Sequence, residues 1–405
     1  MPYPLFSTPS VAARLSSHFQ PIVSLSHQRV VGHEALLRGA DENGKPIPPL
    51  TLFGSLSDSG QQRLDRHALH LHLATFAAAP RPQALHRWLF VNLRPATFLE
   101  IMAVPAQALL DRLATLGCQP QDIVIEVTEE SVAGGERLEA ASRRARELGC
   151  LLALDDFGAG HSNFDRVWRL EPDIVKLDRS LVQRAAHEPR AARIVAQMVS
   201  LLHECGALVL MEGIETEDEA QLALDCDVDL AQGYFFGRPQ PTLADTADVP
   251  AQLAGIWDRF QHRRGSAQQA ERRELTPYLA AIDQAAVALK QGAALAAACA
   301  AFLQLPRAQL CYQLDDEGRQ LHDTVLAARC LVPRRTRFAP LHDAAQARWA
   351  RRPYFLRALE AIGVPQTTRP YLSMQGTGLC VTVSIALRRP DGRVVVLCGD
   401  VGLDR

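Results

Sequence analysis

The stretch LLALDDFGAGHSNFDRVWRLEPDIVKLD, residues 151–178, decides the fold. It begins with a short apolar run, 151–156, that ends in two aspartates, and it closes with a second run, 172–178, that ends in Lys-Leu-Asp. A longer amphipathic segment separates the two. Short apolar, β-branched runs indicate strands, and apolar residues at helical spacing indicate a helix. The stretch therefore predicts a strand–helix–strand unit.

The same pattern repeats from about residue 19 to residue 236. Further strand-like runs lie at 19–25, 30–37, 87–93, 122–128, 207–214 and 230–236, and amphipathic segments such as 190–206 lie between them. Eight units over roughly 230 residues predict an α/β protein with a TIM-like (β/α)8 barrel. A doubly wound open sheet is the alternative, but it is expected to carry a glycine-rich phosphate turn after its first strand, and the sequence has none there.

The pattern changes after Pro239. Residues 249–304 contain few glycines or prolines and have helical periodicity, which predicts a helical connector. Residues 305–405 contain short strand-like runs, the last two joined by Pro390-Asp391-Gly392, a strong hairpin signal. We predict a barrel over 1–248, a connector over 249–304 and a small α+β module over 305–405.

Composition excludes several classes of protein. The 405 residues are 47% apolar and 22% charged, which argues against a disordered, collagen-like or coiled-coil chain. A net charge of -2 provides no overall field to attract polymeric nucleic acid or an acidic membrane. The sequence has nine cysteines without a CxxC pair, and it has neither a signal-like start nor an apolar run of membrane length. These features predict a cytoplasmic protein.

Polar side chains follow seven of the predicted strands. One of them alone would be typical of a helix cap or a solvated turn, but capping does not require nearly every strand to end in an oxygen ligand. In a barrel these positions converge on the C-terminal rim, where active sites form. They are Glu34, Asn92, Glu126 with Glu129, Asp155 with Asp156, Lys176 with Asp178, Glu212 with Glu215, and Gln232.

The donor set predicts the chemistry. Carboxylate and amide oxygens without histidine or cysteine suit Mg2+ or Mn2+, and several acids around one rim can hold two ions. Two-metal sites activate water for phosphodiester hydrolysis. Lys176 is predicted either to neutralise charge on the reacting phosphorus or, alternatively, to form an internal ion pair with Asp178 or Asp155.

Eight motifs, in this order, resemble the EAL-domain cyclic-di-GMP phosphodiesterases over about residues 10–245. They are Phe19-Gln20-Pro21-Ile22-Val23, Glu34-Ala35-Leu36-Leu37-Arg38, Asn92 in FVNL, Glu126 in EVTEES, Asp155-Asp156-Phe157-Gly158-Ala159-Gly160, Lys176-Leu177-Asp178, Glu212-Gly213-Ile214-Glu215-Thr216 and Gln232-Gly233-Tyr234. The resemblance implies a barrel that binds cyclic di-GMP and cuts one phosphodiester bond to give linear pGpG. It also implies a homodimer and two Mg2+ or Mn2+ ions per site. Ca2+ is expected to inhibit, because a larger, loosely coordinated cation fits the in-line geometry poorly.

The resemblance also implies roles for single residues. Metal ligation is expected of Glu34, Asn92, Glu126, Asp155, Asp156 and Asp178. Glu212 is the candidate general base, Lys176 acts on the water and phosphate, and Gln232 orients the water. The ligand is expected to lie against Gln20, Leu36 and Arg38, and Arg38 can form forked hydrogen bonds to a phosphate. Glu129 and Glu215 are expected to hold other groups in place.

Two features qualify this function. The family loop DDFGTGYSSL corresponds to residues 155–164 here, where Ala159, His161 and Asn163 stand in place of Thr, Tyr and Ser. This difference favours an alternative function, in which the barrel is a catalytically weak or inactive receptor for cyclic di-GMP. Residues 305–405 more weakly resemble PAS-like or Cache-like sensor modules. Such modules bind small ligands or dimerise, so control of the barrel by an unknown ligand is expected, with Arg369 and Asp400 as candidate polar positions.

Overall fold

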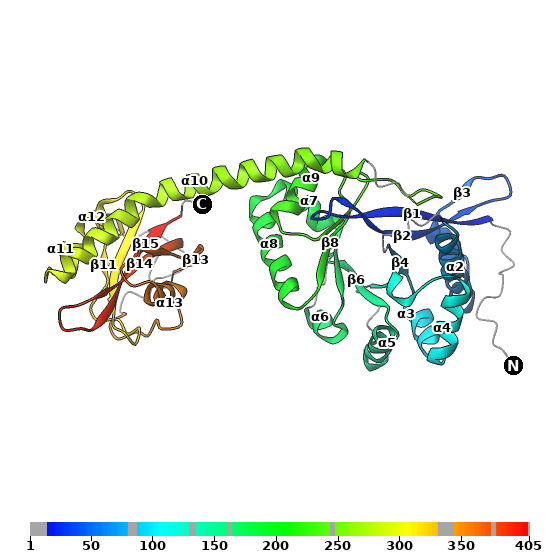
Figure 1. Ribbon diagram of the computed structural model, residues 1–405, viewed down its shortest axis with the longest axis horizontal. Helices are drawn as coiled ribbons and strands as arrows, with labels where there is room; N and C mark the ends of the chain where they lie inside the picture. Colours follow the sequence, from blue (N-terminus) through cyan, green and yellow to red (C-terminus); the bar gives the residue numbers. More distant parts are fainter. Residues whose placement is uncertain are drawn as a thin grey trace. The chain divides into compact units, whose positions relative to one another are not determined.

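The computed structural model describes residues 14–79, 87–128, 135–159, 164–243, 248–330, 344–373 and 378–403, with the backbone alone at 267–268 and 271–272. The chain divides into two compact units, residues 1–263 and 264–405. The division lies inside one long helix, α10 (Val249–Lys290), which contributes residues to both units (Figure 1). We describe each unit separately.

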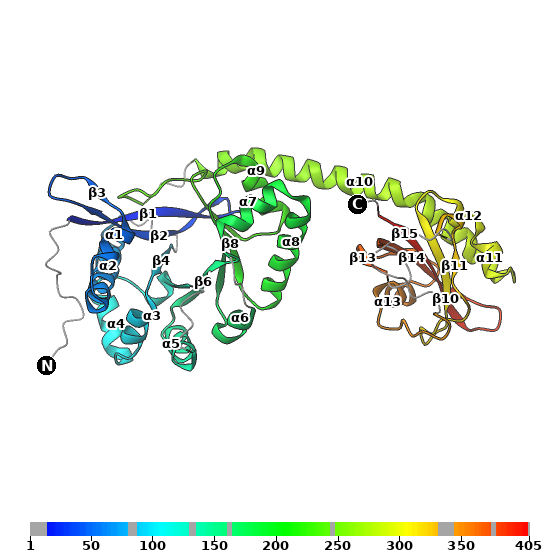
Figure 2. The same cartoon turned by 180° about the vertical axis from the view of Figure 1, so that it is seen from behind.

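The first unit is a closed eight-stranded barrel surrounded by helices, which confirms the predicted TIM-like fold (Figure 2). Around the barrel the order is β1-β9-β8-β7-β6-β5-β4-β2, and β1 pairs with β2 to close it. Each of the eight predicted runs overlaps one barrel strand. The strands are β1 (Arg14–Ser24), β2 (Arg29–Ala40), β4 (Trp88–Asn92), β5 (Ile123–Thr128), β6 (Leu151–Phe157), β7 (Ile174–Leu177), β8 (Leu208–Met211) and β9 (Leu230–Gln232).

The barrel departs from strict strand–helix alternation at its first strand. β1 runs antiparallel to both neighbours, β2 and β9, whereas the other pairings around the barrel are parallel. The turn between β1 and β2 is only residues 25–28, far shorter than the dozen or more residues that a parallel crossover needs. A short strand, β3 (Pro46–Ile47), continues the β1–β2 ribbon beyond the barrel.

Helices cover the outside of the barrel, and local sequence signals mark where several of them begin. Thr216 and Glu219 form a reciprocal capping box at α9, and Ser57 caps α2. The helices are α1 (Pro49–Gly54), α2 (Asp58–Ala78), α3 (Pro95–Met102), α4 (Ala106–Thr115), α5 (Gly135–Glu147), α6 (Phe164–Leu170), α7 (Arg179–His187), α8 (Pro189–Glu204) and α9 (Glu217–Asp225), with a 3-10 turn at Pro120–Asp122.

The barrel interior is built in layers because alternate strand residues point inward. One layer is apolar and comprises Ile22, Phe90, Val124, Ala153, Ile174, Leu210 and Leu230. Two residues further toward the C-terminal rim, the same strands carry Asn92, Glu126, Asp155, Lys176 and Gln232, and Glu212 directly follows β8. Because side chains on the same face of a strand are two residues apart, a polar residue two positions after an apolar one lies directly above it. The polar residues therefore form a layer on top of the packed apolar layer.

The second unit is a small α+β domain. Its antiparallel sheet has the order β11-β10-β15-β14-β12, and β13 also pairs with β14. Residues of α10 and α12 pack on one face, and α13 packs on the other. The predicted Pro390-Asp391-Gly392 turn joins β14 to β15, with Gly392 at φ 85°. The elements are α11 (Leu295–Ala298), α12 (Ala300–Gln304), β10 (Ala308–Leu314), β11 (Val325–Leu326), a 3-10 turn (Ala328–Cys330), α13 (Pro353–Glu360), β12 (Gln366–Thr367), β13 (Tyr371–Leu372), β14 (Leu379–Arg388) and β15 (Val394–Gly402).

Within the described ranges, no helix is both long enough and apolar enough to cross a membrane.

Candidate active site

Lys176 lies at the centre of the polar layer. Its ammonium nitrogen is 2.5 Å from Glu126 Oε1, 2.7 Å from Glu212 Oε1 and 3.0 Å from Asp155 Oδ1, and its side chain is only 1% exposed. Three neighbouring strands, β5, β6 and β7, together with the residue that follows β8, supply this cluster. Of the two internal ion pairs considered for Lys176, the structure contains the one with Asp155.

The electrostatics of this cluster follow from its burial. Burial acts to lower the pKa of Lys176, but the charges of Glu126, Glu212 and Asp155 outweigh that effect and raise this pKa well above its ordinary value. Burial also raises the pKa of Glu126 well above its ordinary value, although Lys176 opposes the rise. One ammonium group therefore compensates several carboxylates that would otherwise repel one another.

Glu34 is held by two side-chain amides. Asn92 Nδ2 donates to its Oε1 over 2.8 Å, and Gln232 Nε2 donates to its Oε2 over 2.7 Å. These residues come from β2, β4 and β9, so their contacts run along the part of the rim where the barrel closes. A carboxylate that accepts two such bonds is fixed in orientation, as a metal ligand must be.

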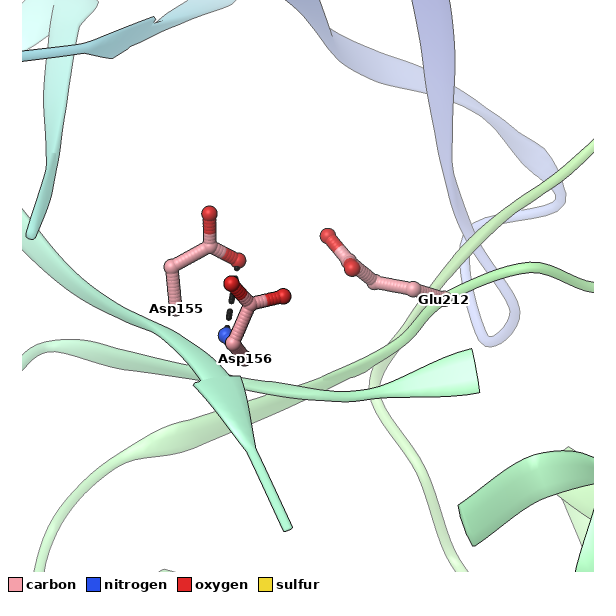
Figure 3. Close-up of side chains that lie close together, drawn as sticks. All are labelled: Asp155, Asp156 and Glu212. Atoms are coloured by element: carbon pink, nitrogen blue, oxygen red, sulfur yellow. Dashed lines mark hydrogen bonds between the residues drawn. The ribbon is translucent and has the colours of Figure 1, made fainter. Parts of the chain in front are cut away.

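Asp155, Asp156 and Glu212 form the acidic part of the site. One carboxylate oxygen of each lies within 4.8 Å of the others, and Figure 3 shows Glu212 facing the two aspartates across a gap. Asp156 has a φ of 57° and its backbone nitrogen donates to Asp155 Oδ1, and the strand register shifts between Leu154 and Phe157, so an irregularity in β6 brings both acids to the site. Burial raises the pKa of Glu212 to about 8, with Lys176 opposing.

The buried oxygen atoms of the site fit a hard cation. Glu126 Oε2 and Gln232 Oε1 are both buried and have no hydrogen-bond partner among the described residues. Leaving such atoms unpaired is costly unless another partner satisfies them. Together with the three clustered acids they offer a donor set of oxygens alone, which is suited to Mg2+ or Mn2+. The residues present therefore fit the predicted kind of metal.

Two of the predicted residues, Asp178 and Glu215, have partners outside this cluster. Asp178 caps α7, because its Oδ1 accepts hydrogen bonds from the Ser180 backbone and hydroxyl groups. Glu215 is exposed and forms a 3.0 Å ion pair with Arg179. Glu129 lies outside the described residues. The same holds for His161 and Asn163 of the altered loop.

The predicted ligand-contacting residues lie on the β1–β2 ribbon. Gln20 is directly opposite Glu34 in the antiparallel register, and Leu36 and Arg38 follow Glu34 at two-residue spacing, so all four share one face. Gln20 Nε2 donates to the Gly237 carbonyl, and Arg38 Nη1 donates to the Leu37 carbonyl. The ribbon thus extends this face beyond the rim.

Sequence reasoning missed two structural features beside the site. A Cβ added to Gly233 would lie 1.9 Å from the Ile214 carbonyl oxygen, so only glycine permits the contact that sets the position of Gln232. Arg238 stacks over the Tyr234 ring, 4.1 Å from its centroid. The stretch QGYFFGR contains Gln232, Gly233, Tyr234 and Arg238, but their contacts depend on the fold of the loop after β9.

The fold and the site define a class: a TIM-like barrel with a carboxylate-rich, metal-competent site at the C-terminal ends of its strands. Residues 10–239 match the EAL domain model, and the chain belongs to the EAL domain family. This confirms the family identified from the motifs.

Solved and curated relatives agree with this assignment. The structure of YkuI, an EAL-domain protein of Bacillus subtilis solved with c-di-GMP and calcium, aligns with a TM-score of 0.79 at 22% identity, covering 96% of this chain and 97% of that chain. The cyclic di-GMP phosphodiesterase RocR of Pseudomonas aeruginosa is 28% identical over 231 residues, 56% of this chain and 57% of its own. PdeF, a cyclic di-GMP phosphodiesterase of Escherichia coli, is 28% identical over 229 residues, 56% of this chain and 30% of its own. The chain thus spans less than two thirds of the length of these two curated relatives.

Proposed function

We propose that the barrel hydrolyses cyclic di-GMP to linear pGpG with two Mg2+ or Mn2+ ions. The observation that carries the proposal is the polar layer above the apolar floor: three clustered acids, a buried lysine and two amides at the ends of successive strands. The names of the curated relatives, RocR and PdeF, support the substrate.

Each residue has a role that its position permits. Glu212 lies beside Asp155 and Asp156 and holds a proton readily, because burial raises its pKa, so it can accept the proton of the attacking water. Lys176 stabilises the added negative charge of the reacting phosphate. Gln232 Oε1, buried and unpaired among the described residues, accepts a hydrogen bond from that water. Arg38, on the same face as Glu34, contacts a phosphate of the bound dinucleotide.

Bound Mg2+ or Mn2+ would supply Lewis-acid activation of water and charge stabilisation at the phosphate. Glu34, Asn92, Glu126, Asp155 and Asp156 would hold the ions, and Asp178 could join them by leaving its cap. Ca2+ is expected to inhibit, because it accepts a looser coordination geometry than the in-line reaction needs.

The test is a product assay. Purified full-length chain with Mg2+ or Mn2+ should convert cyclic di-GMP to pGpG, separated by chromatography, and excess Ca2+ should suppress conversion. Glu34→Ala and Lys176→Ala should abolish it, whereas the matched surface changes Glu42→Ala and Lys45→Ala should not. Absence of product with intact, metal-loaded protein would refute the hydrolase.

A cyclic-di-GMP receptor is the second candidate. Ala159 replaces the family's Thr in the loop after β6, and Asp156, near the end of β6, is exposed. A receptor would bind cyclic di-GMP tightly in the titration calorimeter and release no pGpG. That result, with binding lost in Arg38→Ala, would establish the receptor in place of the enzyme.

The proposal includes a homodimer and control by residues 305–405 through a small ligand. Trp168 on α6 is 69% exposed, which is apolar surface that a second copy would cover. Light scattering of wild type and Trp168→Ser should give a dimer and a monomer, respectively. Asp400, fully buried in the second unit, is the polar group through which we expect a ligand to be sensed.

A further inference from the structure

An apolar pocket lies in the helix layer of the barrel, away from the polar layer. It has a volume of about 80 Å³ and is enclosed by α2, α3 and α4 together with the outward faces of β4 and β5. Figures 1 and 2 both show these three helices side by side next to β4. One water needs about 10–15 Å³ of such space, so the pocket is several times larger than a water site.

The helix α4 covers this pocket without filling it. Its apolar side chains, which include Leu109 and Leu113, line the pocket, yet none of the residues of α4 is fully buried. The helix α8, by contrast, buries Val195, Val199 and Leu202 against the barrel. Because the walls offer almost no polar partner, water gains little inside, whereas an apolar molecule replaces missing packing contacts.

Arginine side chains are among those that line the pocket. Two of the lining side chains are charged, Arg66 of α2 and Arg112 of α4. Arg66 Nη1 pairs with Glu100 at 2.5 Å, but its Nε is buried and has no hydrogen-bond partner among the described residues. An N–H left unpaired in this way is suited to a carboxylate oxygen, which can accept from it.

The pocket shares its strands with the polar layer. Val91 and Leu93 line the pocket and flank Asn92, and Ile125 lines it and precedes Glu126. Alternate strand residues face opposite sides, so a molecule between α4 and these side chains presses on the backbone that positions two residues of the site. Each pocket residue named here is therefore the direct chain neighbour of a residue of the site.

We propose that this pocket binds an aliphatic carboxylate, with its chain under α4 and its carboxylate on Arg66, and that its occupancy changes metal binding at the site. The binding stands independently of the proposed function, whereas the coupling to metal rests on it. Charge and apolarity together select the ligand: a neutral hydrocarbon leaves Arg66 Nε unpaired, and a short acid leaves the pocket unfilled.

Titration calorimetry and thermal unfolding of the full chain test the binding with octanoate as the probe. Octanoate should bind saturably and raise the Tm, octan-1-ol should bind at least threefold more weakly, and acetate should not bind. Leu113→Phe, and independently Leu109→Phe, fill the pocket and should abolish the effect. Leu201→Phe, at an exposed position of α8, is the matched control and should bind octanoate as wild type does.

Two further experiments test the role of the Arg66 charge and the coupling between the pocket and metal binding. Arg66→Gln should weaken octanoate at least tenfold, whereas Arg63→Gln on the same helix should not. Saturating octanoate should change the Mn2+ affinity at least threefold in wild type and not in Leu113→Phe. The proposed binding site is refuted if octanoate does not bind. It is also refuted if octanoate binds Leu113→Phe and Leu109→Phe as well as it binds wild type, while both variants retain the wild-type circular dichroism spectrum. An unchanged Mn2+ affinity overturns the coupling, and failure of Mn2+ to bind at all counts against the proposed function alone.

Discussion

Gln232 Nε2 donates a hydrogen bond of 2.7 Å to Glu34 Oε2, so the last strand of the barrel is joined to the second through side chains of the site. The two residues are 198 positions apart in the chain. Gln232 can do this and still present its Oε1 to the site, because the two ends of an amide have opposite hydrogen-bonding roles.

Replacing this amide should impair the reaction more than the fold. Gln232→Leu keeps the approximate shape but removes both donor and acceptor, so we expect pGpG formation to fall by about a hundredfold, the scale of one lost stabilising contact. The free energy of unfolding should fall by only about 1–2 kcal/mol. Steady-state rates and urea unfolding measure the two effects, with the exposed Gln291→Leu as control. A loss of rate matched by complete unfolding would contradict this role.

Removing the buried ammonium should destabilise the metal-free barrel. Lys176→Met leaves Glu126, Asp155 and Glu212 without their shared cation, and breaking a buried ion pair costs about 3–5 kcal/mol. Urea unfolding in a chelator should show this loss. Adding Mn2+ should recover part of it, since the ion supplies the missing positive charge. The double variant Lys176→Met/Glu126→Gln should be more stable than Lys176→Met. Equal stability of the two variants would count against charge as the cause.

The contact between Gly233 and Ile214 should not tolerate a methyl group. A Cβ at Gly233 would lie 1.9 Å from the Ile214 carbonyl oxygen, so Gly233→Ala must shift the loop after β9 and displace Gln232. We expect a loss of about 2 kcal/mol or more in unfolding free energy and a strong loss of hydrolysis. Gly255→Ala is the matched change, because it is exposed on α10 with nothing within 4 Å, and it should stabilise by about 0.4–1 kcal/mol. Differential scanning calorimetry compares them, and similar behaviour of both variants would refute the steric argument.

Asp400 should make the second unit less stable as pH rises. Burial raises its pKa from 3.8 to about 6, although hydrogen bonds from Thr382 and Ser373 oppose the rise. Because the folded state favours the protonated form, this contribution is fully present below pH 4 and is lost as pH rises through 6. The difference corresponds to about 3 kcal/mol.

Asp400→Asn removes the titration and isolates this effect. The difference in unfolding free energy between wild type and variant should move in favour of the variant between pH 4.5 and 7, as measured by urea unfolding with hydrogen exchange of β15. A difference that does not vary with pH would show that Asp400 does not titrate in this range.

Much of the fold was predictable because its signals are local. Strand runs such as 151–156 carry their own periodicity, and the rule that parallel strands present their carboxyl ends on one rim then gathers Asn92, Glu126, Asp155 and Lys176. The antiparallel direction of β1 was not predicted, because it depends on the turn at residues 25–28, which is too short for a parallel crossover.

The sequence alone determined the residue types of the site and the strand ends that carry them, since both depend on spacing along one segment. Only the tertiary structure decided which groups are partners. Lys176 pairs with Glu126, Asp155 and Glu212 because the stagger of closed strands brings these ends to one level, while Asp178 turns to cap α7 because β7 has already ended at Leu177. The pocket under α4 is likewise a property of packing between elements, which no single segment encodes.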